Sequence, residues 1–210
     1  MGLRIITRRN LATACKELSN RDPALGRVLE SYGTPPLWDR EPGFATLIQI
    51  ILEQQVSLAS ARACFDKLRA RLGDVTAASL LSLDDAEMKA VGFSRQKTAY
   101  ARHLAEAVLE GKFDFAVLDK LPDAEAKHEL IQLKGVGHWT ADIYLLMAML
   151  RPDVMPRGDL ALHVAWQNLT AAERRPDSDE FLQIAERWRP LRSVAARILW
   201  HYYLRQKHDR

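Results

Sequence analysis

The most informative segment of the chain is Leu133-Lys134-Gly135-Val136-Gly137-His138-Trp139-Thr140-Ala141. Two glycines flank one apolar residue, and glycine alone enters left-handed backbone conformations without steric cost, so this segment predicts a tight hairpin. A helical pattern precedes it over residues 123–133, and an apolar helical run follows over residues 140–150. The sequence therefore predicts a helix, a hairpin and a second helix in direct succession.

The predicted hairpin and the carboxylate that follows it indicate a role on nucleic acid. Backbone N–H groups at the start of the second helix point outward, with the positive end of the helix dipole behind them, and such donors suit a phosphate oxygen. Asp159 follows Gly158 at the start of a further predicted helix, twenty residues beyond Trp139. A phosphate grip combined with one fixed carboxylate suggests chemistry on nucleic acid.

This pattern resembles the helix–hairpin–helix DNA glycosylase superfamily, and most closely its 3-methyladenine DNA glycosylase II branch. Three further segments carry the likeness. Ile51-Leu52-Glu53-Gln54-Gln55-Val56-Ser57 is similar to the branch's DNA wedge, residues 91–97 to its second turn, and residues 185–200 to its C-terminal helix. The matches follow the family's order from about residue 44 to residue 204, which is most of the chain.

The resemblance implies an all-α, two-lobed fold with the active site in the cleft between the lobes. Helical periodicity dominates, and no alternating strand pattern persists. We expect residues 43–150 to form a central lobe with the hairpin, and residues 1–42 plus 151–210 to form a second lobe with the catalytic Asp and the C-terminal helix. The expected helices span residues 8–18, 22–32, 43–54, 57–72, 94–110, 123–132, 139–150, 159–169, 178–187 and 191–206, with short turns near 76–90 and 113–119. No room precedes the first matched segment for the N-terminal β domain of some members, so a minimal form is expected.

The composition is that of a soluble globular protein. Charged residues make up 27% and apolar residues 48%, and no apolar run approaches the roughly 20 residues that span a bilayer. We expect no membrane partner, no secretory signal, a monomer, and a cytoplasmic location that is nucleoid-associated in a bacterium. Two cysteines, Cys15 and Cys64, are expected to be reduced thiols and are too few for a four-thiolate iron–sulfur cluster.

The charge is concentrated at the C-terminal end. From Arg187 to Arg210, seven Lys and Arg side chains stand against one acid, a local net charge of +6 in a chain that carries +3. Such a face suits a DNA backbone, although a solvated helix face with a basic tail has the same pattern.

Asp159 has two compatible interpretations. A carboxylate after a glycine at a helix start is commonly an N-cap. The resemblance implies that it is also the catalytic residue, because breaking an N-glycosidic bond builds positive charge on the deoxyribose and a nearby anion stabilises it. It could also orient or activate the attacking water. Relatives that cut the strand carry a lysine nucleophile just after the hairpin, where this chain has His138 and Trp139, so the resemblance implies a monofunctional enzyme.

Two tryptophans are expected to line the base pocket. Core packing is the ordinary role of a Trp on an apolar helix, and we assign Trp166 and Trp188 to it. Trp139 and Trp200 fall where the family places pocket aromatics, and an alkylated, cationic purine is attracted to an indole face. Ile143 stands where some relatives have an aromatic, so the pocket is expected to be wider.

Gln54 and Gln55 lie where the family inserts a side chain into the gap left by the flipped base. Several relatives have a large apolar residue there, so a glutamine is a departure. It could hydrogen-bond the orphaned base, the wedge could come from another loop, or Gln54 could be a solvated helix end.

The resemblance also implies the DNA contacts and the cofactors. The expected DNA-binding residues are Lys134, Gly135, Val136, Gly137, His138 and Thr140. Main-chain carbonyls of Ile131, Leu133 and Val136 match those that coordinate a structural Na⁺ or K⁺ in the family. No other cofactor is expected, and the six histidines show no zinc spacing.

The expected function is removal of alkylated bases, of the 3-methyladenine and 7-methylguanine type, from double-stranded DNA in base excision repair. Two alternatives remain open. One is a helix–hairpin–helix DNA-binding module in which Asp159 is only a cap, and the other is a glycosylase for oxidised, deaminated or mismatched bases.

Overall fold

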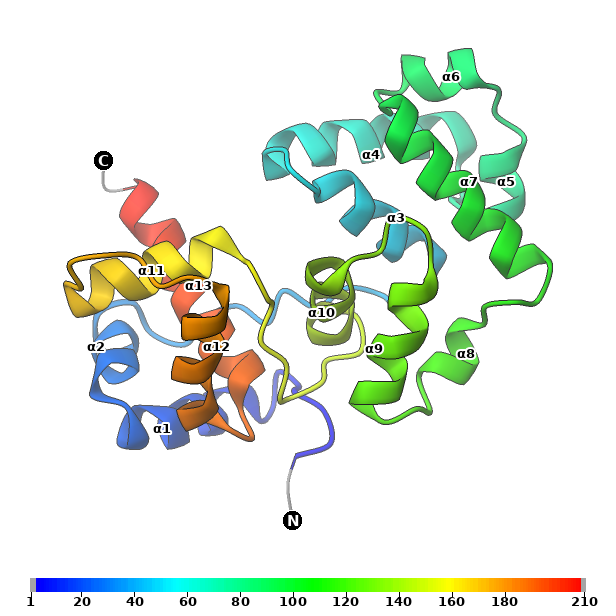
Figure 1. Cartoon of the computed structure of the whole chain (residues 1–210). Helices are drawn as coiled ribbons and strands as arrows, with labels where there is room; N and C mark the ends of the chain where they lie inside the picture. The colour runs from blue at the N-terminus through cyan, green and yellow to red at the C-terminus, as the bar shows by residue number, and fades with distance from the viewer. Residues whose placement is uncertain (1–2, 209–210) are drawn as a thin grey trace. The chain divides into compact units, whose positions relative to one another are not determined.

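The computed structural model describes residues 3–208, and within that range it contains helices and no strand (Figure 1). The prediction of an all-α fold is confirmed. The chain divides into two compact units, one formed by Arg40–Tyr144 and the other by Met1–Asp39 together with Leu145–Arg210. No helix among residues 3–208 has both the length and the apolar character that crossing a membrane requires.

The unit of residues 40–144 contains eight helices among its residues. They are α3 (Phe44–Glu53), α4 (Leu58–Leu72), α5 (Ala77–Leu81), α6 (Asp85–Ala90), α7 (Arg95–Leu109), α8 (Phe115–Leu118), α9 (Asp123–Gln132) and α10 (His138–Met147), the last of which continues into the other unit. Helix α3 is buried on nearly all sides, and Leu47, Ile48, Ile50, Ile51 and Leu52 are at most 2% exposed. A helix with so little exposed surface is covered by its neighbours on nearly every side, so α3 is the centre of this unit's core.

The other unit contains α1 (Leu11–Arg21), α2 (Pro23–Tyr32), α11 (Leu160–Thr170), α12 (Ser178–Ala185), a 3₁₀ turn η1 (Glu186–Trp188) and α13 (Arg192–His208). Helix α13 packs against α1, α2 and α11. Asp22 joins distant parts of this unit, since Oδ1 accepts from the N–H of Ala24 at the start of α2 and Oδ2 accepts from the buried indole of Trp188 at 2.8 Å. Trp166 packs edge-on against Trp188, as the core assignment of both residues requires.

The structure differs from the expected elements in two places. The segments expected as turns near 76–90 and 113–119 contain the short helices α5, α6 and α8, so that prediction is wrong. Helices α5 and α6 form because Thr76 with Ser79, and Asp84 with Glu87, make reciprocal capping boxes. One unit boundary lies after Tyr144, inside α10, rather than at the expected break after residue 150.

The end of α10 belongs to the other unit because two hydrogen bonds hold it there. The carbonyl of Leu146 accepts from the guanidinium of Arg197 at 2.8 Å, and the carbonyl of Leu150 accepts from the N–H of Ile6 at 2.8 Å. Arg197 is fully buried and also donates to the carbonyls of Leu37 and Ser193. Three distant backbone segments therefore meet at one side chain.

Candidate DNA-binding hairpin and carboxylate site

The predicted hairpin is present between α9, which ends at Gln132, and α10, which begins at His138. Gly135 has φ +85°, and a Cβ at that position would lie 2.2 Å from the ring of Tyr100. Any side chain at residue 135 would therefore be both strained and in collision. The carbonyl of Leu133 accepts from the N–H of Val136 at 3.0 Å and closes the turn.

Gly137 has a different role from Gly135. Its φ lies outside the left-handed region, and a Cβ there would meet nothing within 4 Å. The expectation that both glycines serve a left-handed turn is therefore wrong for Gly137. The space at Gly137 is open to the outside at the first turn of α10, where helical N–H groups lack intrahelical acceptors, so the missing side chain leaves room for a ligand to approach the backbone.

The other residues expected to bind DNA at the hairpin differ in solvent exposure. Lys134 and His138 are exposed, whereas Val136 and Thr140 are buried. Lys134 and His138 can therefore reach a ligand with their side chains, and the buried pair can contribute only backbone atoms. The Oγ1 of Thr140 is already engaged, because it accepts a hydrogen bond from Gln54.

The two glutamines expected at the wedge lie in distinct environments. Gln54 is half-buried, and its Nε2 donates to the carbonyl of Gly135 at 2.9 Å and to Thr140 Oγ1 at 2.8 Å. Gln55 is exposed and has a left-handed backbone with φ +57°. Of the two, the geometry favours Gln55 as the side chain that can extend away from the protein.

Asp159 is the N-cap of α11, as the capping interpretation predicts. Its Oδ1 accepts from the N–H of Leu162 at 3.1 Å and from the indole Nε1–H of Trp200 at 3.2 Å. Asp159 and Trp200 are each only 9% exposed. The structure thus brings together two predicted site residues that are 41 positions apart in the chain.

Trp38 extends this group and was missed by the sequence analysis. It is half-buried, and its ring meets that of Trp200 edge-on, with centroids 6.4 Å apart and an interplanar angle of 80°. Its φ of +50° is unusual for a bulky side chain. Such strain persists only where the surroundings hold it and is commonest at functional sites. No sequence signal identified it beyond a tryptophan in an irregular segment.

His163 lies one turn beyond Asp159 on α11 and was also missed. It is 6% exposed, and its ring lies tilted against that of Phe181, with centroids 4.7 Å apart and an interplanar angle of 41°. It also donates a hydrogen bond to the backbone of Pro176, where the acceptor can only be the carbonyl because proline has no N–H. Burial lowers the pKa of His163, and the nearby carboxylate of Asp159 partly opposes that shift. The Nε2 of His163 is buried without a hydrogen-bond partner.

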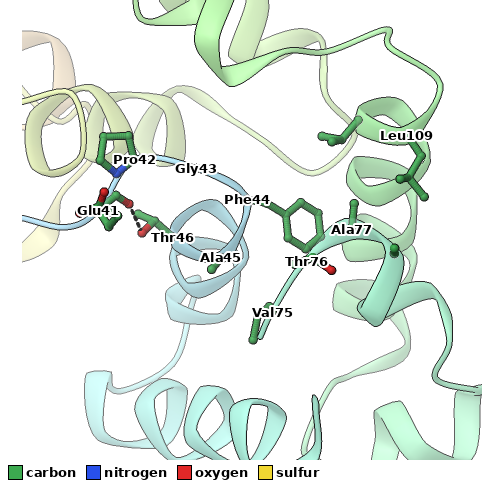
Figure 2. A pocket seen from close by; sticks show the side chains of 12 residues that line it. Glu41, Pro42, Gly43, Phe44, Ala45, Thr46, Val75, Thr76, Ala77 and Leu109 are labelled. Carbon is green, nitrogen blue, oxygen red and sulfur yellow. Dashed lines mark hydrogen bonds between the residues drawn. The ribbon is translucent and has the colours of Figure 1, made fainter. Parts of the chain in front are cut away.

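The remaining predicted pocket residues lie on α10. Trp139 is half-buried, and Ile143, one turn later, is 2% exposed. Ile143 therefore contributes mainly to the core of its own unit. A separate apolar hollow of about 490 Å³, around Phe44, Val75 and Leu109, contains none of the predicted site residues (Figure 2).

The basic C-terminal segment is less available than its sequence indicates. Arg197 is buried, and Arg192 is paired with Asp153 at 2.9 Å and with Glu186 at 3.0 Å. The expectation of a continuous basic face over residues 187–210 is therefore wrong for these two arginines. These two arginines instead bind carboxylates and backbone carbonyls within the protein.

No group of three or more His, Cys, Asp or Glu side chains among residues 3–208 could hold a metal ion. The expected monovalent cation would use backbone carbonyls of Ile131, Leu133 and Val136. The carbonyl of Leu133 already accepts the N–H of Val136. The cation site stays a prediction. Burial raises the pKa of the Cys15 thiol to about 12, which leaves it protonated and unreactive.

The chain is similar to known proteins of DNA repair. The family model of the HhH-GPD superfamily base excision DNA repair proteins matches residues 48–190. DNA-3-methyladenine glycosylase 1 of Schizosaccharomyces pombe is 27% identical over 180 residues, covering 84% of this chain and 79% of that protein. DNA-3-methyladenine glycosylase 2 of Escherichia coli is 29% identical over 197 residues, and the match covers 85% of this chain and 64% of that protein.

A solved structure is similar as well. The 3-methyladenine DNA glycosylase of Schizosaccharomyces pombe in complex with abasic DNA superimposes with a TM-score of 0.84 at 28% identity. The match covers 90% of this chain and 95% of that one.

Proposed function

Because the chain belongs to the HhH-GPD superfamily of base excision DNA repair proteins, we propose that it is a DNA glycosylase for alkylated purines. Its substrates are bases of the 3-methyladenine and 7-methylguanine type in double-stranded DNA, in line with the names of its relatives. The observation that carries the proposal is the carboxylate of Asp159, which is nearly buried and held by the N–H groups of Leu162 and Trp200.

Asp159 supplies the negative charge that the reaction needs. Cleavage of the N-glycosidic bond leaves positive charge on the deoxyribose, and a fixed anion beside the sugar stabilises the transition state more than the ground state. Two N–H donors on Oδ1 orient the carboxylate before the substrate arrives, so no reorganisation is needed during the reaction. The same carboxylate orients the attacking water.

Aromatic rings recognise the base. A purine alkylated at N3 or N7 carries a positive charge, and an indole face attracts a cation by about 0.5–2 kcal/mol. Trp200 and Trp38 supply such rings beside Asp159. The role of Trp139 in recognising the base stays a prediction from the family resemblance. A cationic base is already a good leaving group, which explains why the site needs no strong general acid.

The hairpin holds the DNA backbone through N–H groups at the start of α10, with Lys134 and His138 exposed beside it. Phosphate contacts of this kind position the duplex without reading its sequence. The residues after the hairpin include no lysine, so the enzyme is monofunctional and leaves an intact abasic strand. We further propose that it acts as a monomer and requires no cofactor beyond a structural Na⁺ or K⁺.

The test is incubation of the purified protein with methylated duplex DNA and identification of the released bases by chromatography. Release of methylated purines, with strand breaks appearing only after alkali, supports the proposal. Borohydride should trap no protein–DNA adduct, because no amine reacts with the sugar. Tight DNA binding with no base release would instead leave Asp159 as a cap in a binding module, and release of oxidised or deaminated bases alone would change the substrate.

A further inference from the structure

The turn after α3 and the hairpin before α10 are joined by one side chain. Gln54 Nε2 donates to the carbonyl of Gly135 at 2.9 Å and to Thr140 Oγ1 at 2.8 Å. These partners lie 81 and 86 residues further along the chain, one within the hairpin and one in the first turn of α10. Neither segment can shift relative to the other without breaking these hydrogen bonds.

Helix α7 contacts both segments. Lys97 Nζ donates to the carbonyl of Leu52 at 2.6 Å and to that of Gln54 at 3.0 Å. These carbonyls end α3, where intrahelical donors run out and a cation is favourable. Three residues later on α7, the ring of Tyr100 fills the space where Gly135 would otherwise carry a side chain. The same helix therefore contacts the turn through Lys97 and the hairpin through Tyr100.

The turn that these residues hold exposes side chains suited to insertion between bases. Gln55 has a left-handed backbone without being a glycine, a conformation that needs support from its surroundings. Val56 is 45% exposed and Leu58 is 63% exposed, both large apolar residues. Residues 55–58 form this exposed turn.

We propose that Gln54 and Lys97 are positioning residues that lock the exposed turn to the phosphate-binding hairpin. The hairpin's grip on the DNA backbone then directs the exposed turn into the gap left by the extruded base. This inference rests on the proposed glycosylase function. Extruding a base from a matched duplex is costly, and the cost is least for a base that is already unpaired. Loss of the lock should therefore impair extrusion while DNA binding and bond cleavage survive.

The experiment compares Gln54→Leu and Lys97→Met with Lys97→Arg, which keeps the donors. Lys89→Met is the charge-matched control, because Lys89 is exposed on α6, which belongs to neither of the two segments. The substrates are duplexes with one 7-methylguanine, either paired or in a single-base bulge, with 2-aminopurine as its neighbour. Single-turnover release of the base measures excision, and 2-aminopurine fluorescence measures unstacking.

Gln54→Leu and Lys97→Met should slow excision from the paired duplex at least about tenfold, since each removes two hydrogen bonds to the turn or hairpin. In both variants the fluorescence change should slow by the same factor as excision. Both variants should excise the bulged base at a rate within about threefold of that of the unmodified protein. Binding to undamaged duplex should change little. Lys97→Arg should recover most of the lost rate, and Lys89→Met should match the unmodified protein.

Two results would overturn the inference. One is excision from the paired duplex at the unmodified rate by both variants, and the other is an equal loss on the paired and bulged substrates, which would indicate a role in folding or catalysis only. Should Lys97→Met fail to fold in a thermal melt, Gln54→Leu decides the question. If the unmodified protein releases no base, the proposed function fails, but the fluorescence change still tests the lock.

Discussion

Replacing Asp159 with asparagine removes one negative charge and almost nothing else. The side-chain oxygen of asparagine can still accept from the N–H groups of Leu162 and Trp200, and asparagine caps helices about as well as aspartate. The residue keeps its size at a position that is 9% exposed. The fold should therefore survive, and only the interaction with the sugar cation should be lost.

The magnitude follows from the low exposure of Asp159. For unit charges about 4 Å apart at an effective dielectric constant near 20, the interaction is on the order of 4 kcal/mol. Each 1.4 kcal/mol or so corresponds to a tenfold change in rate, so excision should slow roughly thousandfold. The ground state contains no sugar cation, so the affinity for damaged duplex should stay within a few fold.

The assay is single-turnover release of 7-methylguanine from duplex DNA, together with a thermal melt and a binding titration. Asp177→Asn is the matched control, because Asp177 caps α12 with the same chemistry and its side chain accepts from the N–H groups of Asp179 and Glu180. Because Asp177→Asn loses only the charge of a helix cap, the excision rate of this variant should equal that of the unmodified protein. Excision at the unmodified rate by Asp159→Asn would show that Asp159 is only a cap and refute the catalytic assignment.

Three further predictions concern stability and the DNA grip. Gly135→Ala should lower the melting temperature, because the positive φ and the collision with Tyr100 together cost about 1–3 kcal/mol of stability. Gly137→Ala should melt normally but bind duplex DNA more weakly, as a salt-dependent titration would show. Arg197→Met should destabilise the fold by roughly 3 kcal/mol or more in urea unfolding, because three buried carbonyls lose their donor; a change below about 1 kcal/mol would contradict this. Burial lowers the pKa of His163 in the folded state below 6.5, so the unfolded chain binds the proton more readily. The stability that His163 contributes is therefore present above pH 6.5 and is lost as the pH falls through the folded-state pKa. His163→Phe should flatten that dependence in unfolding measured from pH 7.5 to 5, and an unchanged slope would exclude His163 as its source.

Features that depend on neighbours a few residues apart could be predicted from the amino-acid sequence. Helix α9 spans the predicted residues 123–132, the hairpin follows it, and Asp159 caps α11. Helix, turn and cap hydrogen bonds join residues at most about five positions apart, so their signals lie within short windows. The short helices α5 and α6, expected as turns, were also predictable from the sequence, because their capping boxes join residues three positions apart.

Which distant side chains contact one another depends on the packing of the helices and could not be predicted from the sequence. Trp200 reaches Asp159 across 41 residues, and Gln54 reaches Gly135 across 81. The strained backbone of Trp38 and the burial of Arg197, whose charge had suggested a DNA-binding face, have no local signature. The sequence states the charge and shape of each side chain, but the packing of the helices determines which partner that side chain contacts. That choice depends on the summed burial of many apolar residues rather than on any one segment.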